Sequence, residues 1–170
     1  MVELLETEYP VFYKPYIDIL DDRSGLTELL EFSLELFEST LYDLDEMKQD
    51  FRYSEGKWTV KEVVQHMIDT ERVFVYRALR FSRKDNTSLP GFEQNSYVEN
   101  CNCTARKYHI LLDEFCLLRR ATILMFKEFD QSVLDLRGPV GGQLVSVRAL
   151  GFICSGHVLH HLEVLKQRYL

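Results

Sequence analysis

Four segments of the chain repeat their apolar residues with the 3.6-residue period of an amphipathic α-helix, near residues 25–48, 60–83, 104–129 and 146–169. No convincing series of strands competes with them. Helices of similar length that each bury one face have a common solution in the four-helix bundle. Because 170 residues also suit one compact domain, we predict a single all-α four-helix-bundle domain over residues 1–170.

Local signals mark where several helices begin. Thr59 and Glu62 are spaced for a capping box, in which each side chain bonds the backbone amide of the other residue, so the second helix is predicted to start here. Thr104 and Ser146 are the predicted N-caps of the third and fourth helices. Before the fourth helix, the Gly-Gly pair at 141–142 lies between short apolar runs and predicts the two-residue turn of a β-hairpin.

The connection between the second and third helices is long for a bundle. It holds about 20 residues rich in Asn, Ser, Pro and Gly, where 2 to 8 are usual. We therefore predict that residues 84–103 form a long crossover that covers a site. The N-terminal segment, residues 1–24, is too aromatic for a disordered tail, and we expect it to pack along the outside of the bundle.

Charge and hydropathy exclude several classes of partner. The formal net charge is -7 and the pI is about 5.3, whereas nucleic acids and anionic membrane surfaces attract clustered Lys and Arg. The chain starts with acidic residues where a signal peptide needs basic ones, and no stretch approaches the roughly 20 apolar residues of a membrane span. We expect a cytoplasmic protein that binds neither nucleic acid nor membrane.

The four cysteines do not form the pattern of a disulfide framework or a zinc site. Cys116 and Cys154 fall inside amphipathic helical patterns, and only Cys101 and Cys103 lie in loop-like sequence. A C-x-C pair without a second Cys or His pair supplies too few ligands for a tetrahedral zinc ion. We expect all four to be small buried or surface thiols.

Three histidines form the strongest functional pattern. His157 and His161 lie four residues apart on an apolar face of the fourth helix, so their imidazoles point the same way. His66 lies beside the apolar seam of the second helix and is a candidate third ligand. Three protein ligands leave a coordination position of a divalent metal ion free for water or substrate, which is typical of a catalytic site.

The residues alone leave alternatives to this site open. Each histidine can instead be a core residue bonded to a carbonyl or carboxylate. If His66 faced solvent, Asp69 or Glu163 would have to supply the third ligand. We expect His160 to have a structural role beside the pair, and Gly156 to let a neighbouring helix or a ligand come close.

The remaining charged groups carry no catalytic signature. His109 has no partner at a useful spacing, and Asp69, Glu71 and Arg72 are expected to form a solvated helix face. The sequence has no nucleophile elbow, no glycine-rich dinucleotide fingerprint and no phosphate-binding loop, so the commonest hydrolase and nucleotide-binding classes are excluded.

Several blocks of the sequence resemble the DinB-like superfamily, particularly its branch of bacillithiol S-transferases. They are KWTVKEVVQH at 57–66, DTERVF at 69–74, YRALR at 76–80, LPGFEQNSY at 89–97, SVRAL at 146–150 and GHVLHH at 156–161. The resemblance implies a four-helix bundle with a long crossover between helices two and three, often a homodimer. It also implies that His66, His157 and His161, but not His160, bind a divalent metal ion.

The leading functional hypothesis is a metal-dependent thiol S-transferase that joins a low-molecular-weight thiol to a small electrophilic substrate. Zinc or nickel is the expected metal, although imidazole serves several ions. Substrate-binding candidates in the crossover and the fourth helix are Phe92, Asn95, Tyr97 and Arg148. The alternatives are a metal-dependent hydrolase that activates water and a non-enzymatic metal-binding or dimerisation module.

Overall fold

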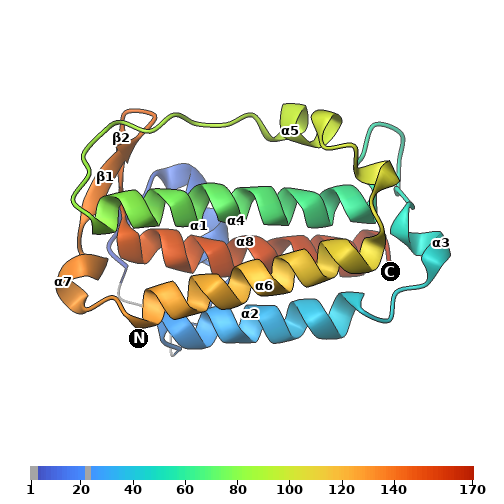
Figure 1. The fold of residues 1–170 in the computed structure, drawn as a ribbon, viewed down its shortest axis with the longest axis horizontal. Coiled ribbons are helices and arrows are strands. Elements are labelled where there is room, and N and C mark those ends of the chain that lie inside the picture. The colour runs from blue at the N-terminus through green and yellow to red at the C-terminus, as the bar shows by residue number, and fades with distance from the viewer. Residues whose placement is uncertain (1–3, 22–23) are drawn as a thin grey trace.

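The computed structural model describes residues 4–21 and 24–170, and four long helices form its bundle (Figure 1). They are α2 (Leu26–Leu41), α4 (Val60–Ser82), α6 (Tyr108–Lys127) and α8 (Val147–Arg168). α4 and α8 pack against each other, α2 and α6 complete the ring, and α4 and α6 run in the same direction (Figure 1). The predicted all-α four-helix bundle with a long crossover is confirmed.

Shorter elements precede the first long helix or connect the long helices. They are η1 (Glu6–Glu8), η2 (Val11–Tyr13), α1 (Lys14–Ile17), α3 (Glu46–Gln49), α5 (Gln94–Asn100), η3 (Cys103–Ala105), α7 (Gln131–Leu134), β1 (Arg137–Val140) and β2 (Gln143–Ser146). The two strands pair antiparallel, with Val140 opposite Gln143, so the predicted hairpin turn at residues 141–142 is confirmed. Both turn glycines have positive φ, 55° and 83°, which glycine adopts without a steric cost.

Two of the predicted helix starts are present. The Thr59 hydroxyl accepts from the Glu62 amide at 3.2 Å, and the Glu62 carboxylate accepts from the Thr59 amide at 2.6 Å. The Ser146 hydroxyl accepts from the Ala149 amide at 2.9 Å and begins α8. The predicted cap at Thr104 is wrong, because this residue lies in η3 and α6 begins only at Tyr108.

The first long helix is also shorter than its apolar pattern. α2 ends at Leu41, and α3 begins separately after Asp45, whose side chain accepts from the Met47 amide at 2.9 Å. An N-cap of this kind starts a new helix because it satisfies amides that have no partner inside the helix. The apolar period of the sequence therefore continues across a break in the backbone.

The crossover follows from the parallel direction of α4 and α6. The chain leaves one end of α4 and must return along the bundle before α6 can start, and α5 lies on this return path (Figure 1). Near its beginning the crossover is attached to the hairpin: the Leu89 amide donates to the Pro139 carbonyl at 2.9 Å, and the Gly141 amide donates to the Leu89 carbonyl at 3.0 Å. The hairpin and the beginning of the crossover are thus hydrogen-bonded to each other.

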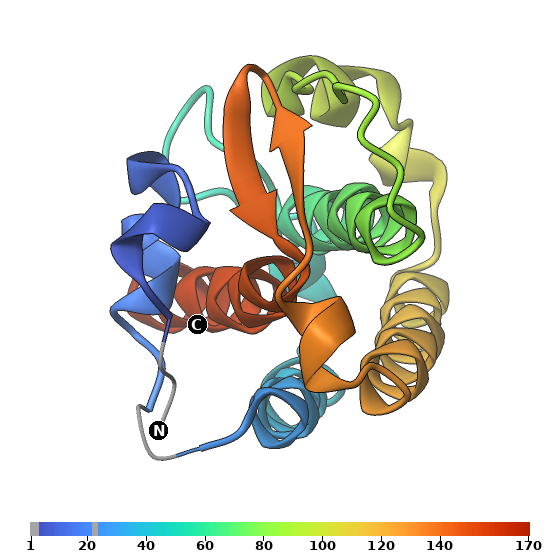
Figure 2. The same ribbon diagram turned by 90° about the vertical axis from the view of Figure 1, so that its left-hand side faces the viewer.

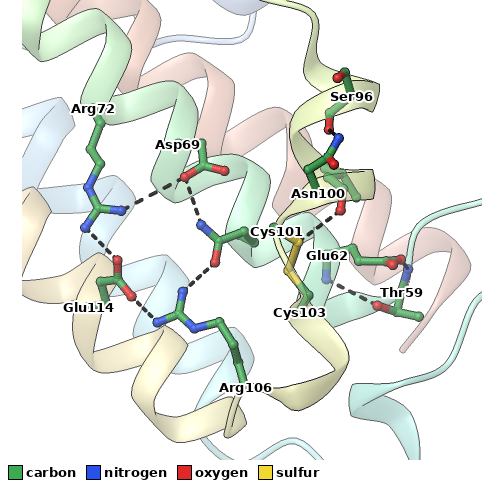
Figure 3. Close-up of a disulfide and its surroundings, with 12 residues drawn as sticks. Thr59, Glu62, Asp69, Arg72, Ser96, Asn100, Cys101, Cys103, Arg106 and Glu114 are labelled. Carbon is green, nitrogen blue, oxygen red and sulfur yellow. Dashed lines mark hydrogen bonds and ion pairs between the residues drawn. A yellow bond between two sulfur atoms is a disulfide. The ribbon is translucent and has the colours of Figure 1, made fainter.

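Cys101 and Cys103 form a disulfide at the end of the crossover (Figure 3). Asn102 between them has φ 52°, and this left-handed backbone brings the two Cα atoms to 5.3 Å. Our expectation that all four cysteines are thiols is wrong for this pair, because a C-x-C spacing does not reveal the chain reversal at its middle residue. Cys116 and Cys154 are buried free thiols, as expected.

The described part of the N-terminal segment, residues 4–21, lies against α8 and is seen to the left of that helix in Figure 2. Contact is closest at Gly156, where an added Cβ atom would overlap with the backbone carbonyl of Tyr16. Gly156 therefore admits α1 directly against the backbone of α8, which is the close approach of a neighbouring helix that the sequence predicted. Tyr16 is carried into the bundle by this contact.

A buried ion pair lies at the centre of the bundle. Arg119 is 0% exposed and donates to the Glu71 carboxylate at 2.6 and 2.8 Å, and it also bonds the Leu30 and Cys154 carbonyls at 3.3 and 3.1 Å. Thr122 donates to the same carboxylate at 2.8 Å. The expectation that Glu71 belongs to a solvated face is wrong, because its side chain points into the core between the four helices.

Asp69 and Arg72, the other two members of that expected face, lie in a network at the surface between α4 and α6 (Figure 3). The Glu114 carboxylate accepts from Arg72 at 2.6 Å and also from Arg106. Gln65 donates to Asp69 at 2.8 Å. Among the residues that the structure describes, no helix is both long and apolar enough to span a membrane.

Candidate metal centre

Three histidine side chains from two helices meet inside the bundle. α4 supplies His66, and α8 supplies His157 and His161 from successive turns. The Nε2 atom of His157 lies 3.0 Å from that of His66 and 3.1 Å from that of His161. His66 is 3% exposed and His157 4%, so the direction that the sequence left open for His66 is inward. These three are the residues that the sequence analysis selected.

The close spacing of the cluster and its protonation state suit a divalent metal ion. Two imidazole nitrogens bound to one tetrahedral zinc ion lie about 3.3 Å apart, close to the observed separations. Burial lowers the pKa of His66 to about 4. Burial, together with the neighbouring imidazoles, also holds the pKa values of His157 and His161 well below their usual range. All three rings are therefore neutral near pH 7, which is the form that binds metal.

The carboxylates considered as alternative third ligands are engaged elsewhere. Asp69 accepts from Gln65, and Glu163 accepts from Gln167 at 2.6 Å. The donor set is thus three imidazole nitrogens, a set that suits zinc, nickel and other divalent transition metals.

Neighbouring side chains orient and shield the cluster. The Thr70 hydroxyl lies 3.4 Å from Nδ1 of His66, and the Trp58 ring lies 4.9 Å from the His66 ring, measured between centroids. Tyr16 packs edge-on against His157 and His160, with ring centroids 5.3 and 5.4 Å away. The sequence analysis missed Tyr16 as part of the site, and its only signal was the aromatic character of the N-terminal segment.

Two cavities open onto different sides of the cluster. The larger, of about 510 Å³, is lined by His66 and His157, and the smaller, of about 280 Å³, by His160 and His161. Aromatic rings dominate the wall of the larger cavity, from Phe12, Tyr13, Tyr16, Phe74 and Phe92. A ligand in either cavity therefore reaches the histidines from its own direction.

Arg77 is a further residue in the wall of the larger cavity. It lies on the buried face of α4, and the sequence analysis gave it no role. A charged residue on such a face is itself a signal, because a long cationic side chain at a core position needs a polar partner there.

The four predicted substrate-binding residues have different surroundings. Phe92 lines the larger cavity and Asn95 the smaller one. Tyr97 packs its ring 5.2 Å from that of Phe92 and lines neither. Arg148 also lines neither cavity, because its guanidinium donates to the buried Glu8 carboxylate at 2.7 Å and so fastens the N-terminal segment.

Comparison with solved structures shows the same fold in YfiT from Bacillus subtilis, described as a probable metal-dependent hydrolase with an unusual four-helix bundle topology. The two chains are 13% identical, with a TM-score of 0.74 over 97% of this chain and 92% of that chain. A search of curated protein sequences found no match. The family model of the DinB superfamily matches residues 29–165, a range that holds all three histidines. The chain therefore belongs to the DinB superfamily.

Proposed function

We propose that His66, His157 and His161 bind one divalent metal ion, zinc or nickel, and that the chain is a metal-dependent enzyme acting on small molecules. The observation that carries this proposal is the convergence of three neutral imidazoles, two buried and one half-buried, beside two cavities. A divalent ion held by three protein ligands has an open coordination position, at which the pKa of a bound water or thiol falls toward neutrality.

The surrounding residues have three tasks in this proposal. Thr70 fixes the ring of His66 through its Nδ1 atom, as the second hydrogen bond of a ligating imidazole does in metal sites. Tyr16 and Trp58 cover the cluster from two separate segments of the chain and exclude bulk water. Phe92 and Asn95 place the crossover over the two cavities.

The reaction we propose is thiol S-transfer from a low-molecular-weight thiol. The thiol sulfur forms a bond to an electrophilic carbon, the leaving group departs with the bonding electrons, and the thiol proton passes to solvent. Such a transfer needs room for two substrates at one centre, and the two cavities on different sides of the histidines offer it. The resemblance to bacillithiol S-transferases supports the same reaction.

Hydrolysis by activated water is the second candidate, and the description of YfiT favours it. It needs one organic substrate rather than two. Turnover of a substrate without any added thiol would identify it, whereas product formation that depends on the thiol concentration would identify the transferase.

Metal content tests the site directly. Elemental mass spectrometry on untagged wild-type protein is expected to find nearly one equivalent of metal, which His66→Ala and His157→Ala lose. His109→Ala is the matched control, because this histidine is exposed on α6 and is absent from the cluster. If wild-type protein reconstituted with zinc, nickel or cobalt held no specific metal, the enzyme proposal would fail and a non-enzymatic bundle would remain.

Activity is then measured with thiol and electrophile pairs. Bacillithiol, glutathione and cysteine are combined with monochlorobimane, whose thioether product is fluorescent. We expect conjugation above the spontaneous rate in wild type and in His109→Ala, and only the spontaneous rate in His157→Ala. Equal rates in wild type and His157→Ala for all three thiols would contradict the transferase.

A homodimer and a cytoplasmic location remain predictions. Ile110, Leu117 and Leu124 are exposed along one face of α6 at seven-residue intervals, a spacing that forms a helix contact stripe. Light scattering on wild type and Leu117→Glu tests the dimer. A wild-type mass of one chain would refute it, and a wild-type dimer that Leu117→Glu dissociates would locate the interface on α6.

A further inference from the structure

Arg77 is a buried cation beside the candidate metal centre. Its residue is 3% exposed, and it lines the larger cavity together with His66, Thr70 and His157. Arg77 follows His66 by eleven residues and Thr70 by seven, so the three lie on one face of α4. A guanidinium remains charged at any physiological pH, and a buried charge is costly unless an anion neutralises it.

Among the residues that the structure describes, Arg77 has only neutral partners. It donates to the Pro90 carbonyl at 2.8 Å and to the Tyr13 hydroxyl at 3.5 Å, and it lies 5.6 Å from the centroid of the Phe74 ring. Within residues 4–21 and 24–170, no carboxylate forms an ion pair with it. A guanidinium has five N–H donors, so these two hydrogen bonds leave three for a ligand.

Glu93 is the one acidic residue in the described wall of this cavity, and its carboxylate is occupied. It accepts from the Ser96 amide at 2.8 Å and from the Asn95 amide at 3.3 Å, so it caps the N-terminus of α5. The negative charge that Arg77 lacks is therefore not supplied by the cavity wall.

Arg119 shows what the fold does with a buried arginine that is structural. Its guanidinium is paired with the Glu71 carboxylate and bonds two backbone carbonyls, and neither cavity reaches it. Arg77 differs in having a cavity where Arg119 has a carboxylate. The difference assigns the missing anion to a ligand.

We propose that Arg77 binds a carboxylate group of the substrate in the larger cavity, so that the enzyme acts on small molecules bearing a carboxylate and an apolar part. This inference rests on the proposed function, since it names the substrate class of the same site. The planar guanidinium matches a carboxylate with two parallel hydrogen bonds, and the aromatic wall takes the apolar part.

The position of Arg77 also sets the shape of the ligand. Eleven residues correspond to about 16 Å along a helix, and long helical side chains lean back toward the N-terminus, here toward His66. The carboxylate consequently lies several bonds from the atom that reacts at the histidines. A simple α-substituted acid is too short to reach both.

The test compares a carboxylate with its neutral amide. Isothermal titration calorimetry measures phenylbutanoate and phenylbutanamide binding to metal-loaded wild type, Arg77→Gln and Arg83→Gln, and to His157→Ala without metal. Wild type is expected to bind the carboxylate about tenfold or more tightly than the amide, the effect of one charge-assisted pair. Arg77→Gln loses this preference. Arg83, exposed at the end of α4 and outside this cavity, is the matched control, and Arg83→Gln keeps it.

The variants distinguish ligand binding by Arg77 from a purely structural role. If Arg77 only holds the Pro90 segment, Arg77→Gln weakens both probes equally and overturns the proposal. If His157→Ala loses the preference, the carboxylate binds at the metal centre, and the proposal is again overturned. No preference in wild type, including no binding of either probe, overturns it as well.

Failure of the proposed function gives a different pattern. If the protein holds no metal and still prefers the carboxylate through Arg77, the carboxylate site at Arg77 stands and the proposed enzyme activity fails. If the protein binds metal and shows no preference for the carboxylate, the metal site stands and the carboxylate site at Arg77 fails.

Discussion

Arg119 and Arg77 are both buried in the bundle, and they define two regions with opposite designs. The Arg119 region is closed: α2, α4 and α8 supply a carboxylate, a hydroxyl and two carbonyls that accept from the guanidinium, and Thr122 donates to the same carboxylate. The Arg77 region is open: neutral groups hold the guanidinium at the edge of a cavity that also reaches the histidines. Burial alone therefore does not identify a functional charge. What identifies it is burial without a charged partner beside a cavity.

The two regions also differ in what they contribute to stability. A complete buried ion pair costs desolvation energy and repays it only through good geometry, but removing one partner leaves an uncompensated charge. In the open region, the Arg77 guanidinium is held without such compensation, which lowers stability and leaves its remaining donors available to a ligand. Variants on each side measure this difference.

The largest effect is expected in the closed region. Arg119→Met leaves the Glu71 carboxylate buried without its cation, so the free energy of unfolding falls by about 3–5 kcal/mol. Urea denaturation measures the loss. Arg120→Met is the matched control, because Arg120 is the neighbouring residue and forms only an exposed ion pair with Glu38, worth about 1 kcal/mol or less. Equal losses of unfolding free energy in the two variants would show that the buried ion pair stabilises the fold no more than the exposed one.

A smaller effect is expected where the N-terminal segment meets the open region. Gly156→Ala places a Cβ atom against the Tyr16 backbone, so α1 moves away from α8 and the unfolding free energy falls by about 1–3 kcal/mol. Gly151→Ala is the control: its Cβ atom meets side-chain atoms of Leu26 and Phe126 at 2.9 Å, and side chains shift more easily than backbone. If Gly151→Ala lowered the unfolding free energy more than Gly156→Ala, the contact between Gly156 and the Tyr16 backbone would not be what holds α1 against α8.

Acid titration tests the hydrogen bonds of Glu8, which hold the N-terminal segment beside the open region. Burial raises the pKa of Glu8, but hydrogen bonds from Arg148, Ser146 and the Leu5 amide outweigh it, so the pKa lies below its ordinary 4.5. The unfolded chain then takes up this proton at a higher pH than the folded protein. The stabilisation is complete above about pH 4.5 and is lost as the pH falls through the folded pKa.

Glu8→Gln is therefore expected to be about 1–2 kcal/mol less stable than wild type near pH 7 and nearly equal to it in strong acid. Thermal unfolding across this pH range measures the difference. A gap between the two proteins that stayed constant down to strong acid would show that the charge of Glu8 does not stabilise the fold.

The smallest stability effect is expected at Arg77. Arg77→Met loses two hydrogen bonds and also removes an unneutralised charge, so the free energy of unfolding changes by about 1 kcal/mol or less. Urea denaturation beside Arg119→Met gives the direct comparison. A loss as large as that of Arg119→Met would break the distinction between the closed and the open region.

Much of the fold followed from the sequence because its signals are local. The 3.6-residue period located all four long helices, the capping box at Thr59 fixed the start of α4, and the glycine pair fixed the hairpin turn. The spacing of His157 and His161 predicted that they share a helix face. Even the role of Glu71 had a signal, since it follows Met67 by four residues and precedes Phe74 by three, and both of these are buried.

The sequence was less informative where contacts between distant parts of the chain determine the structure. Nothing in the sequence indicated that the guanidinium of Arg148 donates to Glu8, 140 residues earlier, and its predicted role in substrate binding stays a prediction. Thr104 looked like a cap, but the reversal at Asn102 shifts the start of α6. Tyr16 had no local pattern that would place it beside His157. Side-chain partners far apart in the sequence are invisible to period and spacing.

The order of the helices along the chain separates the two regions in time as the protein is made. Glu71 and Arg119 lie on α4 and α6, so the ion pair can form as soon as these two helices have left the ribosome. His157 is 91 residues beyond His66 and lies on α8, so a nascent chain that ends before α8 contains only one of the three imidazoles. A metal ion held by the three histidines, as proposed, would therefore not guide the early steps of folding, because its site is incomplete until α8 has been made.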